Sequence, residues 1–128
     1  MSREFTASVD VRFSDLDAYG HVNSAVYFTY LESARLKLFS DQLRGLSEQG
    51  IFVVVARAAC EYRHPITLTD RVQVTVTMAR LGNASFELEY RLHDAGDTTY
   101  ATATTTMVCF DNRAKTPVPL PESIRTLA

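Results

Sequence analysis

The residues best suited to chemistry lie in a short polar segment near the start of the chain. Residues 12–35 read RFSDLDAYGHVNSAVYFTYLESAR, and Asp15 and Asp17 are followed there by Gly20 and His21. A carboxylate on a loop can activate water as a general base or attack a carbonyl as a nucleophile. Aspartates are also common in turns, so their spacing alone favours a structural role. The segment is a candidate acyl-transfer site on chemical grounds.

The helix predicted after this loop supplies a second component of such a site. The helical period of apolar residues runs from Ser24 to about Phe39, Asn23 is placed as the N-cap, and Gly45 is a plausible stop for a frayed continuation. The apolar stripe comprises Tyr27, Tyr30, Leu31, Ala34 and Leu38, and Glu32 and Arg35 are expected to pair on the exposed side. The first amides of a helix have no intrahelical partner, and here they are those near Ser24, Ala25 and Val26. One such donor aimed at an oxyanion is worth about 3 to 4 kcal/mol.

The remaining pattern predicts β-structure within one domain spanning 1–128. The expected strands are Phe5–Phe13, Ile51–Arg63, Arg71–Leu81, Ala84–Leu92 and Thr99–Phe110. The first strand should bury one face, which carries Ala7, Val9, Val11 and Phe13. Strands joined by tight turns are antiparallel neighbours, and a single helix on such a sheet makes an α+β layer. The prolines of the tail exclude a further central strand. Because one helix cannot cover five strands and hide their edges, at least a dimer is expected.

Composition excludes several classes of partner. The formal net charge is -2, from 13 basic and 15 acidic residues, which gives no electrostatic reason to expect nucleic acid or an anionic membrane. No apolar run resembles a signal peptide or a membrane span, so the expected compartment is the cytoplasm. Cys60 and Cys109 are expected to be buried thiols, and His64 and His93 to face solvent.

A metal site built from Asp15, Asp17 and His21 is disfavoured. The segment opens like a calcium loop, but its fifth position is Tyr19 and its twelfth is Val26, which cannot supply the required ligands. Zinc would need a fourth ligand that the neighbouring sequence does not offer. No metal and no cofactor are therefore expected.

The chain resembles the 4-hydroxybenzoyl-CoA thioesterase family of hotdog proteins. The matching pattern begins Asp17-x-x-Gly20-His21-Val22-Asn23 and continues through Tyr27, Tyr30, Glu32 and Ala34-Arg35. Further matches are Tyr62-x-x-Pro65 with Asp70, Ser85-Phe86 with Glu89-Tyr90, and the tail Lys115–Pro121. The resemblance covers nearly the whole chain in the right order.

This resemblance implies a fold, an assembly and a set of site residues. The fold is a helix wrapped by a curved antiparallel sheet, in a homodimer or a dimer of dimers, with active sites at the dimer interface. The family's catalytic aspartate falls on Asp17, and the amide that polarises the thioester carbonyl falls at or next to Ser24. Gly20, His21 and Asn23 complete the expected catalytic set. Some members carry a histidine at the position of Ser24, and this chain does not.

The expected activity is hydrolysis of an acyl-CoA, with Asp17 as base or nucleophile. Tyr27 is expected either to hold the helix and dimer together or to line the acyl pocket. Members of the family often hold the nucleotide at a turn that corresponds here to Arg80, Asn83 and Ser85. Other basic residues that could bind the phosphates are Arg57, Arg63, Arg113 and Lys115. Tyr19, Phe28 and Phe52 suit either an aromatic or a fatty acyl group. The alternatives are a thioesterase for acyl carrier protein and a hotdog protein that binds acyl ligands without hydrolysing them.

Overall fold

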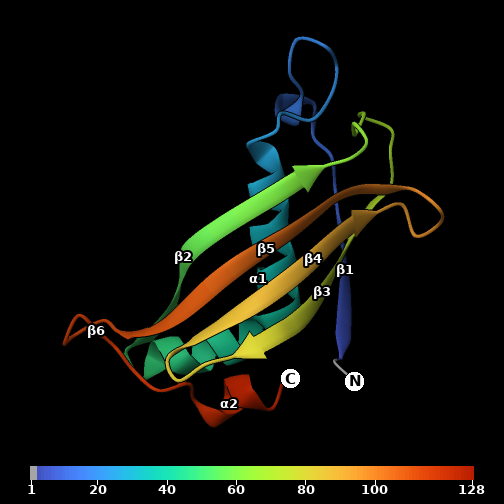
Figure 1. Cartoon of the computed structure of the whole chain (residues 1–128). Coiled ribbons are helices and arrows are strands. Elements are labelled where there is room, and N and C mark those ends of the chain that lie inside the picture. The colour runs from blue at the N-terminus through green and yellow to red at the C-terminus, as the bar shows by residue number, and fades with distance from the viewer. Residues whose placement is uncertain (1–2) are drawn as a thin grey trace.

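The computed structural model describes residues 3–128, and residues 1–2 of the predicted domain lie outside the described part. One long helix lies across one face of a curved antiparallel sheet (Figure 1). The elements are β1 (Glu4–Val9), a 3-10 turn (Phe13–Asp15), α1 (Val26–Glu48), β2 (Ile51–Tyr62), β3 (Val72–Leu81), β4 (Ser85–His93), β5 (Thr99–Asp111), β6 (Thr116–Pro117) and α2 (Glu122–Arg125). The strand order is β1-β3-β4-β5-β2, with β6 added to β5. This confirms the predicted α+β hotdog fold.

The core forms between the apolar stripe of α1 and the inner face of the sheet. Tyr27, Tyr30, Leu31 and Ala34 are buried on the helix, as the helical period predicts. The period-2 alternation of β3 and β4 places their buried residues opposite one another, for example Val76 against Tyr90 and Met78 against Leu88. The same alternation that identifies the strands therefore also fixes the face on which α1 packs.

The helix is longer than the sequence predicts and bends. It continues through Gly45 to Glu48, and Gly50, with φ of +79°, follows its end. Phe39 has non-helical dihedral angles (φ -125°, ψ 20°), and the two parts of α1 meet there. Phe39 is buried whereas Leu38 is only half-buried, because the bend rotates the second part of the stripe. Gly45 is thus not the stop that was predicted.

The first strand is shorter than predicted. It ends at Val9, and the 3-10 turn that follows leaves the Phe13 side chain 80% exposed. The Arg12 N–H donates to Asp15 Oδ2 at 2.9 Å, which turns the chain where an extended strand was expected. The prediction that Phe13 continues the buried face is therefore wrong, while Val11 packs against the edge of the core.

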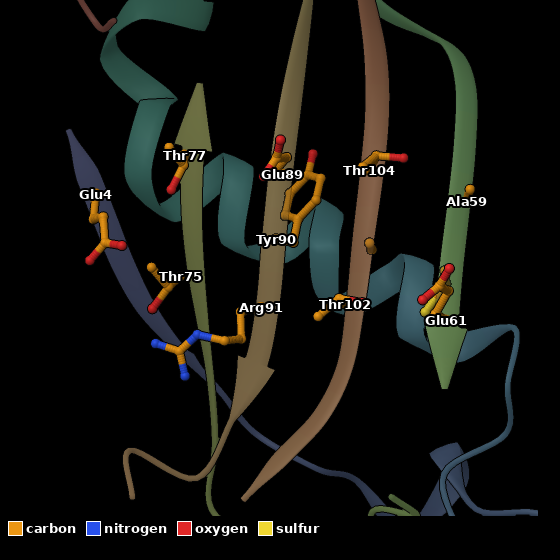
Figure 2. A pocket seen from close by; sticks show the side chains of 12 residues that line it. Glu4, Ala59, Glu61, Thr75, Thr77, Glu89, Tyr90, Arg91, Thr102 and Thr104 are labelled. Carbon is orange, nitrogen blue, oxygen red and sulfur yellow. The ribbon is translucent and has the colours of Figure 1, made fainter. Parts of the chain in front are cut away.

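The sheet has a polar outer face and an apolar free edge. Figure 2 shows Glu4, Thr75, Thr77, Arg91, Thr102 and Thr104 around a shallow hollow of about 470 Å³, with α1 behind the sheet. No residue of the predicted catalytic loop lies in this hollow. Exposed apolar side chains gather instead on β2, which pairs only with β5 among the described strands; they are Phe52, Val54, Val55 and Tyr62. The exposed apolar surface for which the sequence predicts a partner is thus concentrated on the β2 edge.

Candidate active site

The segment from Leu16 to Val22 forms a tight hairpin beside the start of α1. Leu16 and Val22 are bridged, the Asp17 N–H donates to the His21 carbonyl at 2.7 Å, and the Gly20 N–H donates to the Asp17 carbonyl at 3.0 Å. Gly20 has φ of +78°, a conformation that side chains with a Cβ rarely adopt. The glycine therefore lets the loop close on itself and present Asp17 at its rim.

The Asp17 carboxylate is exposed and only half engaged. Its Oδ1 accepts the Tyr19 N–H at 2.9 Å and the His21 N–H at 3.2 Å. These bonds fix the orientation of the carboxylate. Its Oδ2 has no protein partner among residues 3–128 and is available to a water molecule or a substrate. His21 thus helps to position Asp17 through its main chain, and its ring makes no recorded hydrogen bond within the same part of the chain.

Asp15 has the opposite environment although it is only two residues away. Its side chain is 2% exposed, accepts the Tyr30 hydroxyl at 2.7 Å and forms an ion pair with Arg12 at 3.0 Å. Burial alone would raise the pKa of Asp15, but the hydrogen bonds from the Arg12 N–H, the Tyr30 hydroxyl and the Arg12 guanidinium lower it overall. The Asp15 carbonyl also accepts the Asn23 N–H at 2.8 Å. Asp15 therefore ties both ends of the hairpin to α1.

The amides at the start of α1 are not equally available. Asn23 Oδ1 accepts the Ala25 N–H at 3.0 Å, and the Asn23 carbonyl accepts the Val26 N–H at 2.9 Å. Asn23 thus satisfies these two amides from the turn that precedes α1. The helix itself begins at Val26 with Ala25 as its N-cap and no side-chain cap bond, so the predicted start at Ser24 with Asn23 as N-cap is two residues early. The Ser24 N–H has no recorded partner within residues 3–128. Of the three amides predicted to be free, Ser24 is the one left to polarise a carbonyl.

Two tyrosines hold the helix start against the end of β2. The Tyr62 hydroxyl donates to the Ser24 carbonyl at 2.6 Å, and the rings of Tyr27 and Tyr62 meet edge to face with centroids 4.8 Å apart. Burial raises the pKa of Tyr27 to about 12, so its hydroxyl stays protonated at neutral pH. Tyr62 was not predicted as a site residue, although the Tyr62-x-x-Pro65 match pointed to this segment.

These groups surround one pocket of about 410 Å³. It is lined by Asp17, His21, Val22, Asn23, Ser24, Tyr27, Tyr62, Arg63, His64 and Pro65. The structure therefore brings together the predicted residues Asp17, His21, Asn23, Ser24 and Tyr27, with Gly20 shaping the loop behind them. The carboxylate, the free amide and a concave surface are the components that acyl transfer requires.

The predicted nucleotide-binding residues lie elsewhere. Arg80, Asn83 and Ser85 surround the β3–β4 turn, which is at the opposite end of the sheet from the Asp17 hairpin (Figure 1). The turn is closed by the Gly82 N–H, which donates to the Ser85 carbonyl at 2.7 Å. Within one subunit these residues and Asp17 do not share a site.

Other predicted side chains are placed differently by packing. Arg35 does not pair with Glu32; its Nη1 donates instead to the Tyr90 hydroxyl at 3.2 Å. His93 is buried rather than solvent-facing, because its Nε2 bonds Thr75 Oγ1 at 2.8 Å and its Nδ1 accepts the Ala95 N–H at 3.0 Å. Cys109 is buried, Cys60 is half-buried, and both are unpaired thiols.

Two features of the described residues bear on metals and membranes. Within residues 3–128, no group of three or more His, Cys, Asp or Glu side chains lies close enough to hold a metal ion. Asp15 and Asp17 point to different environments, so they do not converge on one ion. Across the same described residues, no helix has the length and hydropathy needed to span a bilayer.

Comparisons with known proteins agree with this fold. A profile of the thioesterase-like superfamily matches residues 11–126. The long-chain acyl-CoA thioesterase FadM of Escherichia coli is 31% identical over 121 residues, which are 91% of each chain. The uncharacterized protein YsmA of Bacillus subtilis is 32% identical over 70% of this chain, and the chain spans 60% of that protein. The solved PA2801 protein of Pseudomonas aeruginosa superposes with a TM-score of 0.86 at 35% identity, over 94% of this chain and 95% of that one.

The fold defines a hotdog protein, and one of its pockets holds the predicted carboxylate beside the free Ser24 amide. The chain belongs to the thioesterase-like superfamily. The predicted resemblance is thereby confirmed at the level of the superfamily, and specificity for 4-hydroxybenzoyl-CoA is not confirmed by these relatives.

Proposed function

We propose that the protein is a cytoplasmic thioesterase that hydrolyses an acyl-CoA to a free acid and coenzyme A. The observation that carries the proposal is the pairing, in one pocket, of an exposed Asp17 carboxylate oxygen with an unoccupied Ser24 N–H. FadM, similar over nine-tenths of both chains, is named for the same reaction, which supports the assignment.

In the proposed reaction the thioester carbonyl oxygen lies against the Ser24 N–H, at the positive end of the α1 dipole. Negative charge develops on that oxygen as the carbonyl carbon is attacked, and the amide stabilises it. With Asp17 as general base, Oδ2 takes a proton from water, and the hydroxide oxygen bonds to carbon. The C–S bond then breaks, and coenzyme A leaves as a thiolate that takes up the proton from Asp17. With Asp17 as nucleophile, Oδ2 itself bonds to carbon, the thiolate leaves, and water then hydrolyses the anhydride.

A single-turnover reaction in heavy-oxygen water separates these two routes. A general base places a label from water in the product acid in the first turnover. A nucleophilic Asp17 whose anhydride is opened by water at the Asp17 carbonyl carbon gives the first product one of its own unlabelled oxygens instead. Opening at the acyl carbon labels the acid as the general-base route does, so it is an unlabelled first product that identifies the nucleophile. The measurement is mass spectrometry of the acid formed with enzyme in excess.

The primary test is thiol release from short, long and aromatic acyl-CoAs by the wild type and Asp17→Asn. Hydrolysis by the wild type and a loss of about 10²-fold or more in the variant are expected. Hydrolysis that Asp17→Asn does not reduce would contradict the mechanism and leave the activity. Absence of turnover on every acyl-CoA would contradict the proposed substrate and favour a carrier-protein thioester or binding without hydrolysis.

The proposal includes a homodimer paired through β2. The exposed Phe52, Val54 and Val55 lie on this free edge, which is a template for a second strand. Antiparallel pairing of β2 with its symmetry mate would bring the β3–β4 turn of the partner subunit to the same end of the sheet as Asp17. At about 4.8 Å per strand, the turn would lie roughly 15 Å beyond the β2 junction. This assembly would reunite the predicted nucleotide site with the catalytic loop.

Light scattering at several protein concentrations tests the dimer. Phe52→Lys should lower the measured mass towards that of a monomer, because a lysine on an edge strand disfavours pairing. Leu68 lies outside β2 and is exposed to a similar extent as Phe52. Leu68→Lys is therefore the matched control and should keep the wild-type mass. A wild-type monomer at all concentrations would contradict the assembly.

A further inference from the structure

An apolar cavity lies between α1, β2 and the C-terminal segment. Its volume is about 310 Å³, which falls within the roughly 300–1,000 Å³ range of small-molecule sites. Glu32 and Arg35 are the only charged or polar residues in its wall. The apolar wall includes Leu36, Phe39, Val53, Met78, Phe86 and Leu127. Such a cavity offers dispersion contacts and few hydrogen bonds, which suits a hydrocarbon.

This cavity and the Asp17 pocket both lie between α1 and β2. The Asp17 pocket is walled by the first turn of α1 and the last residues of β2, with Tyr27 and Tyr62. The cavity is walled by later turns of α1 and by the first residues of β2. Between them, Ala58 and Cys60 of β2 stand opposite Thr105 and Ala103 of β5, whose side chains are buried. These side chains are small and Ala58 is exposed, so little side-chain bulk separates the two pockets along β2.

The distance between the Asp17 pocket and the cavity indicates which acyl groups would reach the cavity. From Ser24 to Glu32, the first residue of α1 in the cavity wall, the helix advances by roughly 12 Å at about 1.5 Å per residue. An extended chain covers about 3.5 Å for every three bonds, so a chain that ends beside Glu32 needs roughly ten carbons. Short acyl groups and single aromatic rings would stop before the cavity. Only a long straight chain joins the two pockets.

We propose that this cavity receives the distal part of a straight aliphatic acyl chain of about ten or more carbons. Ile124 and Leu127, which follow the β-sheet in the C-terminal segment and are buried against the cavity, form its end wall. The proposal rests on the thioesterase function and names its substrate class. The C-terminal segment thus sets the upper limit of chain length, although it is at the far end of the sheet from Asp17 (Figure 1).

The test is the dependence of kcat/KM on chain length, from butanoyl-CoA to hexadecanoyl-CoA, with benzoyl-CoA alongside. The wild type should show a rise that begins near decanoyl-CoA. Val53→Phe extends a ring into the cavity, and the ratio of dodecanoyl to butanoyl kcat/KM should fall about fourfold for each methylene that no longer fits. Leu127→Ala enlarges the end wall and should raise the ratio of hexadecanoyl to dodecanoyl kcat/KM.

Val108→Phe is the matched control. Val108 faces the opposite side of the sheet, where it pairs with Val54 and Ser85, so the same added ring should leave the wild-type chain-length profile unchanged. The two cavity variants are expected to change the chain-length profile in opposite directions. This distinguishes a cavity effect from misfolding, since a misfolded enzyme would lose activity on all chain lengths equally.

Four results would overturn the inference. A wild type that prefers butanoyl-CoA or benzoyl-CoA would remove the aliphatic assignment and leave the thioesterase standing, whereas absence of turnover on all acyl-CoAs would remove both. If Val53→Phe changes the mass in light scattering but not the chain-length profile, the cavity is filled by a second copy of the chain. An unchanged profile at unchanged mass in both cavity variants would place the acyl chain elsewhere.

Discussion

Asp15 and Asp17 are separated by one residue and have contrasting environments. The segment around Asp15 is internal: the carboxylate is buried, paired with Arg12 and bonded by Tyr30. The segment around Asp17 is external: the carboxylate is exposed, and two loop amides hold only one of its oxygens. The same side chain therefore positions the loop in one case and is available for chemistry in the other. The difference comes from which partners are folded against each carboxylate.

The largest expected effect separates activity from stability at Asp17. Asp17→Asn keeps an oxygen for the Tyr19 and His21 amides, so its free energy of unfolding should change by less than about 0.5 kcal/mol. Activity should nevertheless fall by about 10²-fold. Urea unfolding and thiol release on one protein sample measure both. A large loss of stability would show that Asp17 is structural like its neighbour.

Asp15→Asn should show the reverse pattern, with stability as the main loss. The variant keeps the shape of the side chain but removes the charge that Arg12 and Tyr30 contact. Hydrogen bonds to charged groups contribute about 1.5 to 3 kcal/mol, so the free energy of unfolding should fall by about 2 kcal/mol. Urea titration gives the value. If activity falls as far as in Asp17→Asn while stability is intact, the contrast between the two carboxylates is wrong.

Tyr30→Phe tests the link between Asp15 and α1 without touching the loop. It deletes one hydroxyl donor, so a loss of about 1 kcal/mol is expected. In a double-mutant cycle with Asp15→Asn the two losses should not add, because both remove the same hydrogen bond. Full additivity would mean that the Asp15–Tyr30 contact contributes little.

The smallest expected effect is a dependence of the free energy of unfolding on pH. The pKa of Asp15 lies below its ordinary value of 3.8 in the folded protein, so the stability it provides is complete above that value. The contribution is lost as the pH falls through the lower folded pKa, because the unfolded chain binds the proton first. The wild type should therefore lose more stability than Asp15→Asn as acid is added below about pH 4. Equal losses, measured by urea unfolding at several pH values, would remove Asp15 as the responsible group.

The sequence predicts the elements of this fold well and their local ends less well. Alternation in β3 and β4 and the stripe Tyr27–Ala34 identify strands, helix and core, since both periods arise directly from backbone geometry. The end of β1 and the bend at Phe39 depend on contacts between distant residues, which no local pattern contains. The exposed Phe13 follows from the bond between Arg12 and Asp15, and neither residue type specifies that turn.

The sequence likewise predicts only part of the candidate site. The loop motif places Asp17, Gly20 and Asn23 together because they are neighbours in the chain. The contact of Tyr62 with Ser24 joins residues 38 positions apart and needs the sheet to be folded. The satisfaction of the Ala25 and Val26 amides by Asn23 also needs coordinates, since a capping residue can bond several nearby donors. Arg80, Asn83 and Ser85 lie at the β3–β4 turn and would join this site only in the proposed dimer.

The long free edge of β2 has a consequence for handling the protein. If a second copy covers this edge, part of the folding free energy is association energy, and mass action makes the melting temperature rise with protein concentration. Dilution would then expose Phe52, Val54 and Val55 on an unpaired strand of 12 residues. A strand of this kind is prone to add unrelated strands and precipitate. Dilute stocks of this enzyme should accordingly be less durable than concentrated ones.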